Sequence, residues 1–329
     1  MKLLNQPALR YLIASMIFAA KAFSATDWGM ECKDGNSIAC QKVAEGFAGA
    51  GNRAGAIKFY SRACDLRLSS GCTDGATLLD MEGKHQEAAQ LNTKACEYND
   101  ALACAALGAK ADKEGNKAAA KKFFVEGCLK GAGGSCLSLG FMAEQAGDLG
   151  TAREWYVKGC AFNHGDSCNN LAAMERGDGN KPLAHSYYAR ACALHSGAGC
   201  NNLADSFREM GKTVEVRRYY ALSCTYDNYL GCNNLGVIEE LNGKIAEAKK
   251  LYKAACDKNI AHGCRNSGNI ARREGRVKES VALAARATSL LKQGCTAGYS
   301  QSCVDLKAMQ EGGAVSRAPA SEQQQSKTR

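Results

Sequence analysis

The sequence contains little proline and little histidine, and after about its first 25 residues it has no long hydrophobic run. Of the three prolines, only Pro182 lies inside the repeated region, at a first-turn position where helices tolerate proline. The five histidines are dispersed, so the sequence offers no clustered metal site of the kind that a metallo-hydrolase needs. A membrane span takes about 20 apolar residues, and we expect none in the mature protein.

A concentrated positive charge is also missing. The chain has 42 Lys and Arg against 33 Asp and Glu, a formal net charge of +9, but the basic residues are scattered among acids and no basic block alternates with aromatics. This pattern is typical of a solvated surface and argues against a nucleic-acid partner. Loss of an N-terminal signal that carries Lys2, Arg10 and Lys21 would reduce the charge to +6.

Cysteine, by contrast, is abundant and periodic. The 18 cysteines form nine pairs with members eight positions apart, and the first eight pairs begin every 32 positions. The pairs are Cys32 and Cys40, Cys64 and Cys72, Cys96 and Cys104, Cys128 and Cys136, Cys160 and Cys168, Cys192 and Cys200, Cys224 and Cys232, Cys256 and Cys264, and Cys295 and Cys303. A fixed period of this length indicates stacked repeats, none of which can bury its apolar face alone.

Each of these repeats also carries a glycine eleven positions after its second cysteine, from Gly51 to Gly275. Glycine takes the left-handed conformation that ends a helix, so each of them predicts a turn between two helices, A and B. In helix A a large residue precedes a small one, as in Leu235-Gly236, and the small residue would let a neighbouring helix approach closely. In helix B apolar residues recur at helical spacing, as between Ala248 and Ala255. The sequence therefore predicts an all-α solenoid of helical hairpins.

One interval between cysteine pairs is longer than the others. From Cys264 to Cys295 there are 31 positions, whereas every earlier interval of this kind has 24. The surplus is close to two helical turns of about 3.6 residues each, so a helix can lengthen there without rotating its buried face. We predict an extended final helix B from Val277 to Gln293.

The cysteine spacing also predicts a bend. Two residues eight positions apart on one helix would lie about 12 Å apart, beyond the ~7 Å limit for a disulfide, so the chain must bend in the link between helix B and the next helix A. Pairing within the links uses all cysteines, whereas pairing across a hairpin, such as Cys72 with Cys96, leaves Cys32 and Cys303 over. Metal binding is a further alternative, but the spacing resembles neither zinc nor haem signatures. We expect structural disulfides and no metal.

Disulfides favour an oxidising compartment, and the N-terminus agrees with one. Lys2 and Arg10 precede an apolar run at residues 11–20, and small residues follow up to Ala25, which is the layout of a secretory signal. A retained helix, buried or interfacial, is the alternative. We expect a periplasmic or secreted protein with a signal peptide at 1–24, an N-terminal cap at 25–40, eight hairpin repeats at 41–295, a capping helix at 296–310 and a disordered polar tail at 311–329.

The string Gly-Cys-Asn-Asn-Leu-Gly at Gly231–Gly236, nearly repeated at Gly199–Ala204, resembles the Sel-like repeats, which are relatives of the tetratricopeptide repeat. The paired cysteines are similar to those of the Helicobacter cysteine-rich proteins, although the period of 32 is shorter than is typical of that branch. The resemblance covers about Cys32 to Cys303. It implies a right-handed α/α superhelical solenoid whose concave face binds protein or peptide partners. For the cysteine-rich branch it also implies a penicillin-binding protein with weak β-lactamase activity.

Four asparagines, Asn170, Asn202, Asn234 and Asn266, occupy the same position in four successive repeats, and the first three follow another asparagine. If the repeats stack, these amides could form a ladder that holds an extended peptide backbone, because an amide both donates and accepts. The alternative, which we favour from the residues, is that they stabilise the first turn of helix A or adjoin the seam between repeats. We expect a protein or peptide partner, cell-wall related or host-derived, with a β-lactam as the alternative ligand and no cofactor.

The sequence evidence for catalysis is weak. A Ser-x-x-Lys match, Ser289 to Lys292, falls inside the predicted extended helix, and the Ser-Asp-Asn and Lys-Thr-Gly motifs of serine β-lactamases are missing. His164, His195 and His262 occur in the links between paired cysteines, where they could align along one edge, but we favour the interpretation that they are surface residues of the links. We nominate no catalytic residue.

Overall fold

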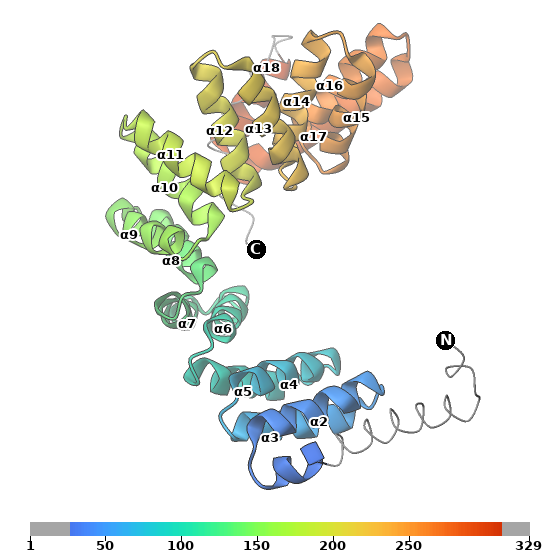
Figure 1. Ribbon diagram of the computed structural model, residues 1–329. Helices are drawn as coiled ribbons and strands as arrows, with labels where there is room; N and C mark the ends of the chain where they lie inside the picture. Colours follow the sequence, from blue (N-terminus) through green and yellow to red (C-terminus); the bar gives the residue numbers. More distant parts are fainter. Residues whose placement is uncertain (1–26, 311–329) are drawn as a thin grey trace, which may run out of the picture. The chain divides into compact units, whose positions relative to one another are not determined.

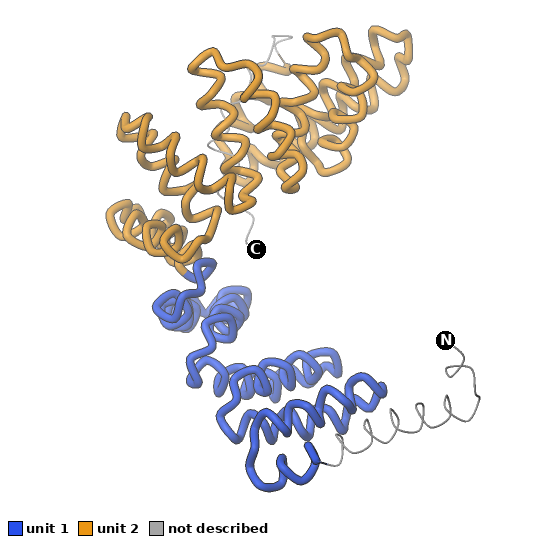
Figure 2. Tube along the Cα trace, viewed as in Figure 1, with its two compact units in different colours: residues 1–135 blue, residues 136–329 orange. Residues whose placement is uncertain are grey.

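The computed structural model describes residues 27–310, and all regular structure in that range is helical. The chain separates into two compact units, residues 1–135 and residues 136–329 (Figure 2). The signal expected at 1–24 and the tail expected at 311–329 lie outside the described residues. Within the described range, no helix combines the length and the apolar character needed to cross a membrane.

Unit 1 is built from consecutive helical hairpins that follow a short helix at residues 27–33 (Figure 1). The hairpins are α2 (Ser37–Gly49) with α3 (Arg53–Asp65), α4 (Ser69–Met81) with α5 (His85–Glu97), and α6 (Ala101–Lys113) with α7 (Lys117–Leu129). Each hairpin also packs on the next one, α3 against α4 and α5 against α6. Leucines and cysteines of successive hairpins, among them Leu79, Leu91 and Leu107, form the core between them.

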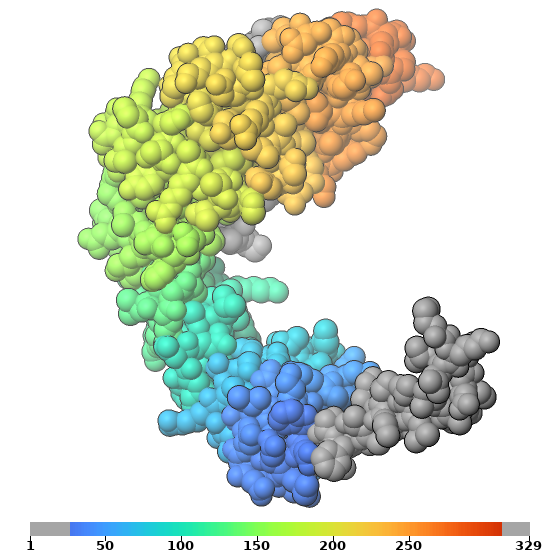
Figure 3. Space-filling model, viewed as in Figure 1, coloured from blue at the N-terminus to red at the C-terminus, as the bar shows by residue number. Residues whose placement is uncertain are grey.

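Unit 2 continues the same alternation beyond the boundary helix α8 (Gly133–Gln145). Its further helices are α9 (Leu149–Ala161), α10 (Gly165–Gly177), α11 (Lys181–Ala193), α12 (Gly197–Glu209), α13 (Thr213–Thr225), α14 (Tyr229–Leu241), α15 (Ile245–Asp257), α16 (Ala261–Arg273), α17 (Val277–Thr296) and α18 (Ser300–Gln310). In this unit the space-filling view shows the colours following one another in sequence order, as expected when repeats pack mainly on their neighbours (Figure 3). The A helices α10, α12, α14 and α16 also contact one another in succession, so they form one layer.

The structure contains the long final helix B, the turn glycines and the close helix contacts that the sequence predicts. Helix α15 has 13 residues and α17 has 20, which confirms the extended final helix B, although it ends at Thr296 rather than Gln293. The turn glycines all have positive φ, from 73° at Gly211 to 86° at Gly179, as predicted. A Cβ added to Gly236 would lie 2.7 Å from Cε1 of Tyr252. The small residue therefore lets the buried ring of Tyr252 lie directly on the backbone of α14.

Disulfides close the links between hairpins. The bridges join cysteines eight positions apart, with Cα–Cα distances of 4.4 to 4.8 Å. They are Cys32–Cys40, Cys64–Cys72, Cys96–Cys104, Cys160–Cys168, Cys192–Cys200, Cys224–Cys232, Cys256–Cys264 and Cys295–Cys303. Cys128 and Cys136 are disulfide-bonded as well, and no cysteine of the described chain is free. Each of these bridges joins two cysteines of one link, as predicted, and none of them joins cysteines across a hairpin.

Candidate functional site

The asparagine pairs of α10, α12 and α14 and the single Asn266 of α16 connect successive repeats of unit 2. Each lies in the second turn of its helix, and the contact between A helices brings the amides of neighbouring repeats within hydrogen-bonding distance. Asn202 Nδ2 donates to Asn169 Oδ1 at 2.8 Å, Asn234 Nδ2 to Asn201 Oδ1 at 3.0 Å, and Asn266 Nδ2 to Asn233 Oδ1 at 2.9 Å. The same geometry thus recurs at three consecutive seams.

Hydrogen bonds inside each pair join these contacts into a continuous chain. Asn169 donates to Asn170 at 3.2 Å, Asn201 to Asn202 at 3.5 Å, and Asn233 to Asn234 at 3.3 Å. Each amide donates a hydrogen bond to the next one along a chain that begins at Asn266 and ends at Asn170. The order is Asn266, Asn233, Asn234, Asn201, Asn202, Asn169 and Asn170. We call these seven residues the asparagine ladder.

The members of the ladder differ in exposure. Asn201 and Asn202 are buried, at 1% and 3% exposure, whereas Asn170, Asn234 and Asn266 are half-buried. A primary amide has two N–H donors and an oxygen with two lone pairs, and an interior ladder position uses one of each. Asn201 directs its remaining donor capacity to Asp205 Oδ2, at 3.4 Å. The half-buried members therefore retain donor and acceptor capacity beyond the ladder.

The ladder lies at the seam between repeats, which is one of the two structural roles that we favoured from the sequence. It does not cap the A helices, which was the other. The first-turn N–H groups are instead capped by other side chains, from His164 on α10, Ser196 on α12 and Asn228 on α14. The four asparagines singled out from the sequence belong to the ladder together with Asn169, Asn201 and Asn233, whose oxygens accept the bonds between repeats. Both members of each pair are therefore needed.

Buried tyrosines tie three of the B helices, α9, α13 and α15, to the helix A before each of them. Tyr156 donates to Glu144 Oε2 at 2.8 Å, Tyr220 to Asp205 Oδ1 at 2.6 Å and Tyr252 to Glu240 Oε2 at 2.7 Å. Burial raises the pKa of Asp205, against the opposing effect of Tyr220 and Arg208, and burial likewise raises the pKa of Glu144. These acids leave no clear periodic signal in the sequence, because the position shared by Glu144 and Glu240 holds Arg176 and Arg208 in the two repeats between them, and Asp205 lies at another position.

The histidines of the links do not form one edge. His164 Nδ1 accepts from the backbone N–H of Ser167 at 3.3 Å, and the His195 ring lies 4.8 Å from the Tyr226 ring, centroid to centroid. His262 is buried instead, with Nε2 3.1 Å from Asp305 Oδ2 of α18. Only His164 and His195 line a common pocket. The favoured interpretation as surface link residues is therefore wrong for His262, and so is the alternative of three aligned histidines.

The remaining candidate chemistry is not assembled in the described residues. Ser289 and Lys292 are exposed on α17, and Ser289 Oγ accepts from Gln293 Nε2 at 3.4 Å. Cys96, Cys104 and Glu126 place their ligand atoms within 4.8 Å of one another, as in a metal site. The two cysteines are bonded to each other, however, and the thiolate that binds a metal is not present in a disulfide.

Comparison with known proteins identifies the architecture. No family model and no curated protein matches the sequence. The structure is similar to that of c5321, described as a protective antigen present in uropathogenic Escherichia coli strains displaying an SLR fold, with a TM-score of 0.60 and 20% identity over 88% of this chain and 68% of that chain. It is also similar to a Sel1 repeat protein from Oxalobacter formigenes, with a TM-score of 0.55 and 16% identity over 66% of this chain and 96% of that chain.

Proposed function

We propose that this chain, which has the Sel1-like repeat fold, is an exported scaffold that binds an extended protein or peptide segment along the A helices of unit 2. The fold suits protein interaction in general, because stacked repeats present the same side-chain positions at regular intervals. The disulfides support export, since such bonds persist in oxidising compartments such as the periplasm or the cell exterior. The cysteine pair in every repeat also favours a place in the cysteine-rich branch of these proteins.

The asparagine ladder carries the proposal. Its hydrogen bonds hold the half-buried amides of Asn170, Asn234 and Asn266 in fixed orientations, and side chains that are already ordered lose less entropy on binding. The capacity that remains on these amides can pair with backbone C=O and N–H groups of a partner without reading its side chains. Asn202 is buried and keeps the ladder continuous between them.

The test is capture of a partner by oxidised protein in which Asn170, Asn234 and Asn266 are replaced by Ala. We expect the variant to keep its helical circular dichroism and its disulfides but to lose the proteins that the natural chain enriches from a periplasmic extract, as identified by mass spectrometry. The control is Asn242→Ala, which changes an exposed asparagine of the same unit outside the ladder. Equal enrichment by the triple variant and the control would contradict the proposal.

A further inference from the structure

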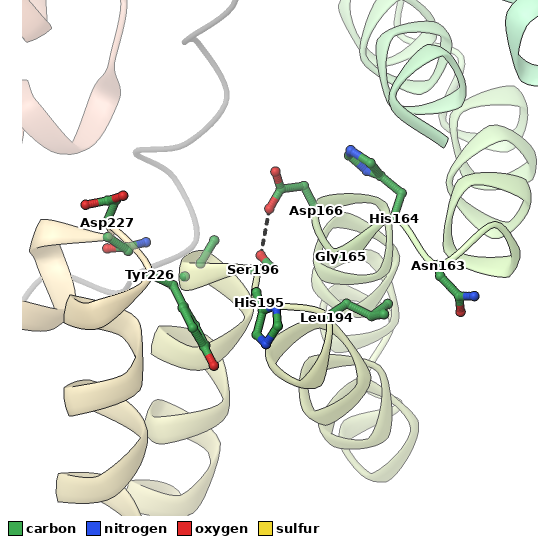
Figure 4. A pocket seen from close by; sticks show the side chains of 12 residues that line it. Asn163, His164, Gly165, Asp166, Leu194, His195, Ser196, Tyr226 and Asp227 are labelled. Atoms are coloured by element: carbon green, nitrogen blue, oxygen red, sulfur yellow. Dashed lines mark hydrogen bonds between the residues drawn. The ribbon is translucent and has the colours of Figure 1, made fainter. Parts of the chain in front are cut away.

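A polar pocket opens in unit 2 where the links before α10, α12 and α14 come together (Figure 4). Its volume is about 430 Å³, within the roughly 300–1,000 Å³ that is common for ligand sites. His164 and Asp166 come from the first link, His195 and Ser196 from the second, and Tyr226 and Asp227 from the third. Because three successive repeats contribute, the pocket exists only in the stacked protein.

The charged side chains of the pocket are acidic. Asp166 and Asp227 line it, and its lining contains no lysine and no arginine. Ser196 Oγ donates to Asp166 Oδ1 at 2.6 Å, which orients that carboxylate (Figure 4). Arg190 of α11 lies outside the lining and contacts the pocket residue Asn163 at 3.2 Å. The lining therefore presents negative charge to a ligand.

Helix starts usually attract anions, but each helix start at this pocket already gives an N–H group to a capping side chain. His164 accepts from the N–H of Ser167, Ser196 accepts from the N–H of Gly199 at 3.1 Å, and Asn228 accepts from the N–H of Leu230 at 3.1 Å. An anion would thus find capped N–H groups and two carboxylates. A cation finds carboxylates to accept its N–H bonds and the Tyr226 ring, which can contribute a cation–π contact.

The pocket does not suit a metal ion. Among the described residues, only Cys96, Cys104 and Glu126 bring three such ligand atoms close together, so no three carboxylates or imidazoles of the pocket lie close enough to hold one ion. A cation on a long stem has no such requirement, because it can reach one carboxylate while its stem lies against a ring.

We infer that this pocket binds a primary ammonium group carried by a peptide, as on a lysine side chain, with Asp166 and Asp227 as the acceptors. The site is separate from the asparagine ladder.

The experiment titrates the oxidised full chain with the peptide Ac-Ala-Lys-Ala-NH₂ at low ionic strength and follows the NMR signals of His195 and Tyr226. We expect saturable shifts, and at least tenfold weaker binding of the same peptide acetylated on the lysine Nζ. Asp166→Asn and Asp227→Asn should each weaken binding about five- to tenfold, because a charge-assisted hydrogen bond becomes a neutral one. Asparagine already occupies the left-handed link position of Asp227 at Asn163 and Asn259, so Asp227→Asn should fold.

Two controls separate the pocket from general surface charge. Asp257→Asn changes the same net charge at an exposed site on α15 and should leave the affinity unchanged. Arg190→Gln removes positive charge beside the pocket and should leave the affinity equal or higher. Equal binding of the acetylated peptide, equal losses in Asp257→Asn and Asp166→Asn, or shifts confined to residues outside the pocket would each overturn the inference. None of these results depends on the ladder variants.

Discussion

Replacing Asn201 with Ala is the sharpest perturbation of the asparagine ladder. Asn201 is 1% exposed and lies in the middle of the chain of amides. It accepts from Asn234 at 3.0 Å, and it donates to Asn202 at 3.5 Å and to Asp205 at 3.4 Å. The substitution removes all three contacts at once and interrupts the connection between α12 and α14.

The three lost contacts determine how much stability Asn201→Ala should cost. Asn234 is half-buried, so its released N–H can return partly to water, whereas the oxygens of Asn202 and Asp205, in residues 3% exposed, lose a donor in a buried setting. A buried group left without a partner costs about 1–3 kcal/mol. The two donated bonds are long and weak, so we expect a total loss of about 2–3 kcal/mol. Asn266→Ala removes a single bond at the half-buried end of the ladder and should cost about 0.5–1 kcal/mol.

Hydrogen exchange resolved by helix is the appropriate assay, because repeat arrays depart from two-state unfolding and one global midpoint would average the effect. The opening free energy of α12 and α14 should fall by the amount given above in Asn201→Ala. The exposed control Asn242→Ala should stay within about 0.5 kcal/mol of the natural chain. If Asn201→Ala is as harmless as this control, or if it costs no more than Asn266→Ala, the ladder does not hold the repeats together.

Further predictions concern the cap, the turns, the links and catalysis. Burial acts to raise the pKa of Asp305, but contact with His262 and other neighbours outweighs this effect and lowers the pKa below its ordinary value. The ionised Asp305 therefore stabilises α18 above pH ~4, and this stabilisation is lost as the pH falls further. Asp305→Asn should remove that pH dependence from the hydrogen-exchange protection of α18. Gly243→Ala forces alanine to φ 76° and should cost about 1–2 kcal/mol, whereas Gly177→Ala, a helical glycine with open space around it, should stabilise by up to about 1 kcal/mol, as measured by hydrogen exchange of the helices that flank each site. Peptide mapping without reductant should recover only cross-links between cysteines eight positions apart, and each bridge should contribute about 2–3 kcal/mol in the chain-entropy model; free thiols or distant cross-links would contradict the fold. Nitrocefin turnover by the oxidised protein should equal that of buffer, and a rate abolished by Ser289→Ala would restore the β-lactamase hypothesis.

The architecture could be predicted from the sequence because its strongest constraints are local and recur in successive repeats. Turn glycines, paired cysteines and the large-small step each act within one repeat or between neighbours, so their spacing translates directly into hairpins and links. The longer α17 followed from the same reasoning, since the surplus before Cys295 is close to a whole number of turns. Even the asparagine ladder left a periodic trace in its four second members.

Some details of the site could not be predicted, because the residues involved have contact partners that do not recur from repeat to repeat. His262 pairs with Asp305, which lies on the irregular closing helix α18, and no spacing rule connects the two. Each link also holds a residue with positive φ, but side chains as different as Arg67, His195 and Asp227 occupy that position. Glycine or asparagine occupies it in the other links, as at Gly131 and Asn163, so the sequence marks this position only in part. The acidic pocket needs side chains from three links at once, a condition that only the stacked structure reveals.

The placement of the disulfides determines what a protease can do to this protein. A cut between Cys192 and Cys200 would leave both pieces tethered by sulfur, and the helices on either side would stay in place. A cut at the glycine turn of Gly179 lies between the Cys160–Cys168 and Cys192–Cys200 bridges, so the two pieces would no longer be joined covalently. Digestion should thus yield fragments bounded by the turns, and a nick in a link should become visible only after reduction.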